Sequence, residues 1–394
     1  MEPFILFGLI LGCSLAFVNG LNDASHSIAT VVATRALSPA KAVFLTAVCN
    51  MLGPFVFTTA VAATIGTAIL TGTALTPTII IVAMASAILL ILAATHLGFP
   101  LSSSNAMVGG LLGAGVAGFG LSVVILPGTA MLSSVAAAGL LGAACGAAVL
   151  GLVTTALHGD VRYGILIGAA CGAAVSIPLM MIAGLIQVTG LLAVVLFIVI
   201  SPVFGMTIAF LIDLLYIRLF MHAHQNRMKR TYQPLHVLAC LLQAAAHGGN
   251  DGQNSVGLMT ALLVAAGVLG SFIVPTWVIL IAALSIGLGT CFGGWGVVER
   301  MAKGITFIRP YQGFCAATAS SGTLTMVTLF GIPVSSTHAI NGAIIGVGAT
   351  RGKSAVNWEA VREIVTAWVV TIPLAFASAF LGYYLLAAVR LLAG

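Results

Sequence analysis

Long apolar stretches alternate with short polar breaks along the whole chain. A stretch of roughly 20 apolar residues is long enough to cross a bilayer as an α-helix, because the hydrocarbon core is about 30 Å thick. The chain has 394 residues. After loops are allowed for, this length accommodates about 10–12 transmembrane or re-entrant segments. We therefore expect an all-α polytopic protein of the cell membrane, plasma or inner, without a separate soluble domain.

Composition supports this prediction and removes one alternative. The chain is 60% hydrophobic and 6% charged, with a mean hydropathy of +1.19. Its net charge of +6 could indicate nucleic-acid binding, but the basic residues lie in short loops such as 218–230 and 300–309. Cytoplasmic loops under the positive-inside rule explain such clusters better, so no nucleic-acid partner is expected. Cysteines occur singly, without metal-ligand spacing.

Two motifs occur twice, in the same order. An Asn-Asp pair at 22–23 returns at 250–251, and a Pro-x-Ser-Ser segment within 98–106 returns within 331–339. The second copies follow the first by 228 and 233 residues, respectively. Two motifs shifted by nearly the same distance indicate an internal duplication.

The duplication divides the chain into three parts. We expect a first transmembrane repeat over 1–157, connecting transmembrane segments and a basic loop over 158–232, and a second repeat over 233–394. Transporters of this size often pair inverted repeats and bind their substrate between them, so inverted repeats are expected here. Each Pro-x-Ser-Ser segment interrupts an apolar region with proline and hydroxyls, which is typical of a broken or re-entrant helix.

The hydroxyl segments are candidate anion sites. Each follows a proline and precedes a plausible helix, whose first free N–H groups carry roughly half a positive charge. Two such helix starts, one from each repeat, could hold a tetrahedral oxyanion without an arginine. The alternative is that these hydroxyls only cap helices or pack between them. The candidates are Ser102, Ser103, Ser104, Asn105, Ser335, Ser336 and Thr337.

The carboxylates of the Asn-Asp pairs require positive charge. Asp23 and Asp251 belong to only eight acidic residues in the chain, and charges within a membrane usually mark an ion or substrate path. Two unit charges ~4 Å apart repel by roughly 4 kcal/mol at an effective dielectric near 20, so co-bound cations or protons are needed. An anion that binds well only with its cation is the thermodynamic basis of symport.

Oxygen-bearing side chains around the carboxylates suit Na⁺. The alternative interpretation makes these polar groups hydrogen bonds between helices. His26 is a candidate pH-sensitive group, or a neutral substitute for an asparagine. The candidate cation ligands are Asn22, Asp23, Ser27, Thr30, Ser102, Asn250, Asp251, Asn254, Ser255 and Ser335.

At these motifs the chain resembles the inorganic phosphate transporter (PiT) family. Residues 20–30 are similar to its Gly-x-Asn-Asp signature, residues 247–255 form a second copy, and both Pro-x-Ser-Ser segments match. The sequence departs from the family at His26, where asparagine is usual, and at 252–253, where small apolar residues are usual. Both departures concern the identity and number of the cations.

The resemblance implies a symporter that imports inorganic phosphate with Na⁺. H⁺ coupling or carriage of a metal–phosphate complex is the alternative, and a sulfate permease is less well supported because such relatives lack the Asn-Asp pairs. By resemblance, the phosphate ligands would be Asp23, Ser103, Ser104, Asn105, Asp251, Ser336 and Thr337. No enzymatic cofactor is implied, and a homodimer is one option for assembly.

Two other classes of protein fit less well. An intramembrane aspartyl protease would use Asp23 and Asp251 as a catalytic dyad, but it would leave the duplicated serine segments without a role. A channel would need repeated carbonyl-lined filter segments, whereas two-fold duplication with buried carboxylates fits alternating access. We therefore expect a transporter that is not an enzyme.

Overall fold

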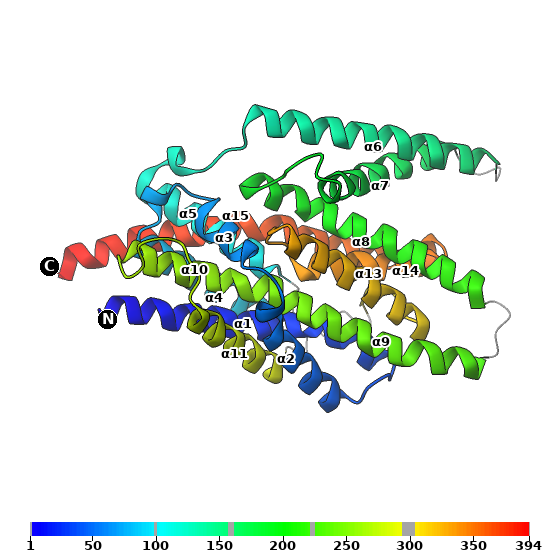
Figure 1. Cartoon of the computed structure of the whole chain (residues 1–394), viewed down its shortest axis with the longest axis horizontal. Coiled ribbons are helices and arrows are strands. Elements are labelled where there is room, and N and C mark those ends of the chain that lie inside the picture. The colour runs from blue at the N-terminus through cyan, green and yellow to red at the C-terminus, as the bar shows by residue number, and fades with distance from the viewer. Residues whose placement is uncertain (1, 98–100, 157–160, 221–224, 294–303, 394) are drawn as a thin grey trace.

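The chain folds into a bundle of helices in the computed structural model (Figure 1). The structure describes residues 2–97, 101–156, 161–220, 225–293 and 304–393, with the backbone alone for 24–26, 29, 33, 225–228 and 393. Within these ranges, seven helices are long and apolar enough to cross a membrane. The prediction of an all-α polytopic membrane protein is confirmed. The seven spans are Pro3–Asp23, Pro39–Val56, Pro77–Leu97, Thr129–Ala156, Val161–Ile182, Gly190–Phe220 and Trp358–Leu392.

Proline opens several of the helices. It stands in the first turn of α1, α2 and α13, where its missing N–H costs no intrahelical hydrogen bond. The first half of the chain holds α1 (Pro3–Ala33), α2 (Pro39–Val56), α3 (Ala60–Thr67), η1 (Gly72–Ala74), α4 (Pro77–Leu97), α5 (Ser103–Phe119), η2 (Leu121–Val123), α6 (Thr129–Ala156) and α7 (Val161–Ile182). The second half holds α8 (Gly190–Phe220), α9 (Gln225–His247), η3 (Gly248–Gly252), α10 (Gln253–Ala265), α11 (Thr276–Phe292), α13 (Pro310–Leu329), α14 (Ser336–Ala349), η4 (Lys353–Ala355) and α15 (Trp358–Ala393).

Two helical hairpins carry the serine segments. The hairpin α4–α5 lies toward the end of the molecule where both chain termini are found, and α13–α14 lies toward the opposite end (Figure 1). The short helices α5 and α14 begin at Ser103 and Ser336. The hydroxyl segments therefore stand at helix starts in the interior of the bundle, as the sequence predicts.

Each hairpin packs against one long helix in the same way. Gly109 and Gly113 of α5 approach backbone carbonyls of α15, and Gly342 and Gly346 of α14 approach backbone carbonyls of α8. A Cβ at any of these positions would collide with the facing backbone. The glycines therefore allow close helix contact, as is typical between membrane helices. The helices α8 and α15 thus occupy equivalent places beside the two hairpins.

The helices α6 and α7 form a separate pair at the edge of the bundle (Figure 1). Glycines at 142, 146, 168 and 172 bring their backbones into close contact, and α7 packs against α8. This pair lies between α5 and α8 in sequence. Among the described residues, its main packing partner in the rest of the bundle is α8.

The second Asn-Asp pair lies in a π-helical turn. The helix α9 continues into the five-residue η3 and then into α10. A Cβ at Gly248 would meet the backbone of Asn50, and one at Gly249 would meet the ring of Phe57. Single π turns within helices often lie at functional sites. Here the turn places Asp251 deep in the bundle, with no exposed surface.

Candidate functional site

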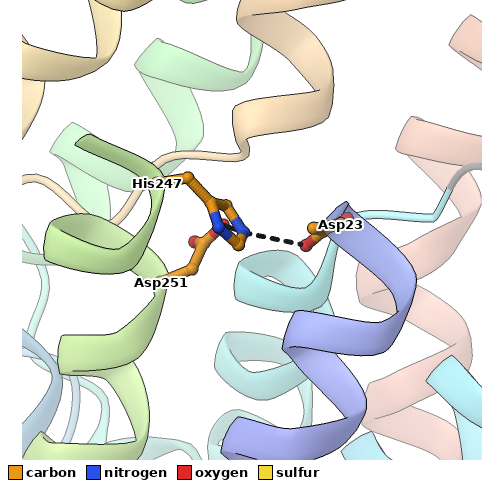
Figure 2. Close-up of side chains that lie close together, drawn as sticks. All are labelled: Asp23, His247 and Asp251. Carbon is orange, nitrogen blue, oxygen red and sulfur yellow. Dashed lines mark ion pairs between the residues drawn. The ribbon is translucent and has the colours of Figure 1, made fainter. Parts of the chain in front are cut away.

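The two motif carboxylates meet at the centre of the protein, on either side of a histidine (Figure 2). His247 Nε2 lies 3.0 Å from Asp251 Oδ2 and 3.8 Å from Asp23 Oδ2. All three residues are buried, with at most 2% of their surface exposed. Each offers one ligand atom within 4.8 Å of the others, so the group has the geometry to hold a cation.

The positions of the three residues follow from two helices that face each other. Asp23 is on α1, whereas His247 ends α9 and Asp251 lies in η3. His247 precedes Asp251 by four residues, so helical periodicity places both side chains on one face. Asp251 has His247 as its one ion-pair partner among the described residues. The carboxylates thus lie together without a lysine or arginine paired to Asp251.

Hydroxyls from both hairpins donate to the carboxylates in a crossed pattern. Ser103 donates to Asp23 (2.7 Å), and Ser104 donates to Asp251 (2.6 Å). From the other hairpin, Ser336 donates to Asp251 (3.2 Å) and Thr337 to Asp23 (3.5 Å). Each aspartate therefore accepts one hydroxyl from its own half of the sequence and one from the other half. This arrangement joins the two hairpin tips at one site.

Asn22 and Asn250 hold the loops that lead into the hairpin helices. Asn22 Nδ2 donates to Leu101 O, and its Oδ1 accepts from Thr95. Asn250 Nδ2 donates to Ile332 O and to Thr328, and its Oδ1 accepts from the N–H of Val334. The threonines are 233 residues apart, the same offset as the serine segments. These amide groups satisfy buried backbone atoms and position the hydroxyls that follow.

A hydrogen-bond chain orients His247. Its Nδ1 lies 2.8 Å from Asn50 Oδ1. Asn50 donates through Nδ2 to Thr290, whose hydroxyl donates to a backbone carbonyl. Because Asn50 Oδ1 can only accept, His247 donates through Nδ1. Its Nε2 faces the carboxylates and can donate to them as imidazolium, or as neutral imidazole can ligate a cation.

The other candidates lie at different places around this centre. Asn254 donates to Ser104 and Asp251. Ser102 accepts from the N–H of Asn105 and so caps α5. Thr30 bonds to His236 and Cys240 instead, about 10 Å along α1 from Asp23, as seven residues of helix require. Also buried are Ser27, Ser255 and Ser335. The side chain of His26 lies outside the described residues.

The structure adds residues that the sequence did not single out for the site. His247, Asn50, Thr95 and Thr328 all contact the central groups or their supports. His247 carries a usable signal, its four-residue spacing from Asp251. Thr95 and Thr328 carry another, their matching positions before the serine segments. Asn50 has no such signal, because its partners come from distant parts of the chain.

This fold and site define a class of protein. Helical hairpins that meet at buried carboxylates and hydroxyls are typical of secondary transporters, which bind ions and substrate near the middle of the membrane. The sequence profile described as "Phosphate transporter family" matches residues 19–163 and 164–379. The chain belongs to this family, and it is a transporter and not an enzyme.

Individual proteins are similar to the chain over nearly its whole length. A protein of Rhizobium meliloti (strain 1021), named "Probable low-affinity inorganic phosphate transporter", is 37% identical over 98% of both chains. A protein of Bacillus subtilis (strain 168) with the same name is 27% identical over 97% of both. A solved structure described as "The sodium-dependent phosphate transporter" aligns with a TM-score of 0.69 and 23% identity, over 98% of this chain and 99% of that one. This structure has the same fold.

Proposed function

We propose that this protein is a symporter that imports inorganic phosphate together with Na⁺. The observation that supports the proposal best is the crossed set of hydroxyl donors on Asp23 and Asp251. The names of the relatives refer to inorganic phosphate, and the similar solved structure is described as sodium-dependent. Both agree with the proposal.

The hydroxyl protons link the binding of cation and anion. Each serine or threonine hydroxyl has one proton, so it cannot donate to a carboxylate and to phosphate at the same time. Na⁺ at a carboxylate neutralises its charge and satisfies its oxygens, which releases the hydroxyl to donate to phosphate. Bound phosphate in turn favours Na⁺ by charge. Each ligand therefore raises the affinity for the other, as linkage requires.

The ligands divide by chemistry in this proposal. The hydroxyls of Ser103, Ser104, Ser336 and Thr337 bind phosphate oxygens, together with the first N–H groups of α5 and α14. The carboxylates of Asp23 and Asp251 hold Na⁺, with oxygens of neighbouring side chains. The amide groups of Asn22 and Asn250 donate to backbone carbonyls of the hairpin loops. We therefore assign these residues to positioning of the hairpins as well as to cation binding.

Proton coupling is the second candidate, and His247 is the observation that favours it. A protonated imidazole between the two carboxylates replaces part of the charge that Na⁺ supplies. A transporter that loads a proton at this point would need no Na⁺. The cation dependence of uptake separates the two mechanisms.

The division into repeats is part of the proposal. The segments 1–157 and 233–394 contribute one hairpin each, and the segment 158–232 connects them. The equivalent packing of α8 and α15 on the two hairpins supports extending the first repeat to include α8. The pair α6–α7 is then an insertion within that repeat.

Uptake of radiolabelled phosphate into proteoliposomes tests the function. One set of vesicles has an inward Na⁺ gradient at symmetric pH, and a second has an inward H⁺ gradient without Na⁺. We expect uptake that requires Na⁺ and is unaffected by excess unlabelled sulfate. Uptake driven by H⁺ alone would assign coupling to His247 and the carboxylates. No uptake under either gradient would contradict phosphate transport.

A further inference from the structure

A row of polar side chains leaves the carboxylate site between α1 and α9. On α1 the row consists of Asp23, Ser27, Thr30 and the C-cap residue Thr34, and on α9 it consists of His247, Gln243, Cys240 and His236. Both sets have spacings of four, three and four residues, so each set forms a continuous stripe on its helix. The two stripes run in opposite chain directions from Asp23 and His247.

Contacts between the helices show that the stripes face each other. His236 lies 3.2 Å from the hydroxyl of Thr30 through Nε2 and 3.4 Å from that of Thr34 through Nδ1. The Sγ of Cys240 lies 3.3 Å from Thr30 Oγ1. Because His247 meets Asp23 at the other end, Gln243 must lie between these contacts. The opposing residue on α1 is then Ser27.

Two amide side chains, that of Gln243 in this row and that of Asn341 on α14, have no hydrogen-bond partner among the described residues. Both residues are fully buried, and the lack applies to the oxygen and the nitrogen of each amide group. Asn341 lies one helical turn after Thr337, whose hydroxyl points at Asp23. Gln243 likewise lies one helical turn before His247. An unpaired buried amide costs roughly 1–3 kcal/mol, so these two groups beside the site point to a ligand that pairs with them.

The row leads toward the basic end of the molecule. The end of α1 and the start of α9 lie at the end opposite the chain termini (Figure 1). Arg35 follows α1, Arg218 lies in the last turn of α8, and Arg230 lies near the start of α9. Under the positive-inside rule, this end faces the cytoplasm.

The seal at this end is an apolar cluster that is much smaller than the one around the first part of α1. The buried cluster between α1, α2, α9 and α13 has six core members, among them Ile28, Val31 and Ala317. The helix α13 closes the row through Gly313, where a Cβ would come within 2.6 Å of the His236 ring. Movement of α13 away from α9 would therefore uncover this part of the row.

We propose that this row is the route by which phosphate leaves the carboxylate site for the cytoplasm, and that Ser27, Gln243 and Asn341 form a second phosphate position along it. The inference rests on the proposed function and deepens it. Amide N–H and hydroxyl groups donate to phosphate oxygens, and this position has no carboxylate of its own to repel an anion. Phosphate that leaves Asp23 and Asp251 meets neutral donors first and the basic end next.

The thiol of Cys240 tests the route without any substitution. Right-side-out and inside-out membrane vesicles are treated with a membrane-impermeant, negatively charged methanethiosulfonate, and labelling of each cysteine is measured by mass spectrometry. Cys315 is the matched control, because it is also fully buried, on α13, but belongs to a different cluster. We expect Cys240 to react at least about tenfold faster from the cytoplasmic face than from the other face, and about tenfold faster than Cys315.

Phosphate with Na⁺ should slow the labelling of Cys240, because it occupies the route. Labelling from the opposite face, absence of labelling during transport, equal rates at Cys240 and Cys315, or no effect of phosphate would each overturn the proposal. Phosphate uptake is measured on the same vesicles. Failure of wild-type uptake contradicts the proposed function, whereas uptake without labelling of Cys240 contradicts only the route.

A pair of variants tests the second phosphate position. Gln243→Leu removes the donor while retaining similar volume, and we expect the maximal rate of uptake to fall about tenfold with little change in the Na⁺ concentration for half-maximal uptake. Thr260→Val is the control, because Thr260 is another buried group without a partner but lies on α10, beyond the carboxylates. Equal effects of the two substitutions on uptake would overturn the proposal.

Discussion

Two helical segments carry the site, α1 and the continuous run α9–η3–α10, and their packing differs on the two sides of the carboxylates. Before Asp23, α1 packs against α10, where Leu262 lies over Gly8 and Met259 lies over Gly12. These contacts belong to the largest apolar cluster of the protein. Beyond Asp23, α1 faces α9 with hydroxyls, a thiol and histidines. The first side is packed mainly with large apolar side chains, whereas the second is lined by facing polar groups, among them Gln243 with both amide atoms unpaired.

This difference determines which side of the site opens at the lower cost in free energy. Large side chains that pack closely against glycines of the facing helix gain dispersion energy. This energy is lost when the two helices separate. Polar groups that lack partners lose nothing when water reaches them, and they gain hydrogen bonds. In this conformation the side toward the basic end is therefore the easier one to open.

The largest effect on phosphate uptake is expected from a substitution at the carboxylates, where the two regions meet. Asp251→Asn removes a charge that accepts from Ser104 and Ser336. We expect Na⁺-dependent phosphate uptake to fall by about a hundredfold or more, because a lost charge-assisted contact of roughly 3 kcal/mol corresponds to such a factor. Uptake into proteoliposomes measures the change.

Asp213→Asn is the control for this substitution. Asp213 is also fully buried, but it accepts from Gln312 and Thr350, away from the carboxylate pair. We expect this variant to keep the Na⁺ dependence of uptake. Equal losses of uptake in the two variants would show that the effect is not specific to the carboxylate pair.

A smaller effect on phosphate uptake is expected from a substitution in the first hydroxyl segment. Ser104→Ala removes a hydroxyl that donates to Asp251 and accepts from Asn254. We expect the phosphate concentration for half-maximal uptake to rise about tenfold, as loss of one hydrogen bond to a charged ligand requires. Ser102→Ala, which removes only the cap of α5, should lower thermal stability and leave this concentration nearly unchanged. The reverse ranking would argue against phosphate binding by Ser104.

Substitution of Asn22 and Asn250 tests whether the two hairpins are equivalent, although their surroundings differ. Asn250→Ala leaves Ile332 O and the N–H of Val334 without their partner. We expect a loss of about 1–3 kcal/mol in the free energy of unfolding. Asn22→Ala should cost a similar amount, because Asn22 holds Leu101 O in the same way. Thermal unfolding in detergent compares the variants, and a loss confined to one of them would contradict equivalent hairpins.

The smallest effect is expected at the seal. Gly313→Ala places a methyl group against His236 and Thr34, which should push α13 outward. We expect Cys240 to be labelled about two- to threefold faster, a change of less than about 1 kcal/mol. Gly322→Ala, on the same helix but with open space around it, is the control. Slower labelling in Gly313→Ala would indicate that the methyl group tightens the seal.

The fold class was predictable because it depends on local composition. Apolar runs of sufficient length must form helices in a membrane, where the backbone has no water to bond with. The hydroxyl segments were predictable for a similar reason, since Pro100 and Pro333 interrupt apolar regions before runs of serine and threonine. The structure places both runs at helix starts.

The π turn and His247 were not predictable to the same degree. The turn depends on the fit of Gly248 and Gly249 against Asn50 and Phe57, which lie about 200 residues earlier in the chain. A lone histidine in an apolar helix is more often structural, and its role here depends on Asn50 and Asp23, both from the other half of the sequence.

The helical membrane fold, the duplication and the residue types of the candidate site could be predicted from the amino-acid sequence, because hydrophobicity, repetition and charge are properties of the chain. Three features follow from helix packing instead: which aspartate accepts from which hydroxyl, the place of His247 between the carboxylates, and the polar contact between α1 and α9. Such contacts join residues that are up to 314 positions apart. They depend on how the helices pack, and packing is a property of the whole molecule.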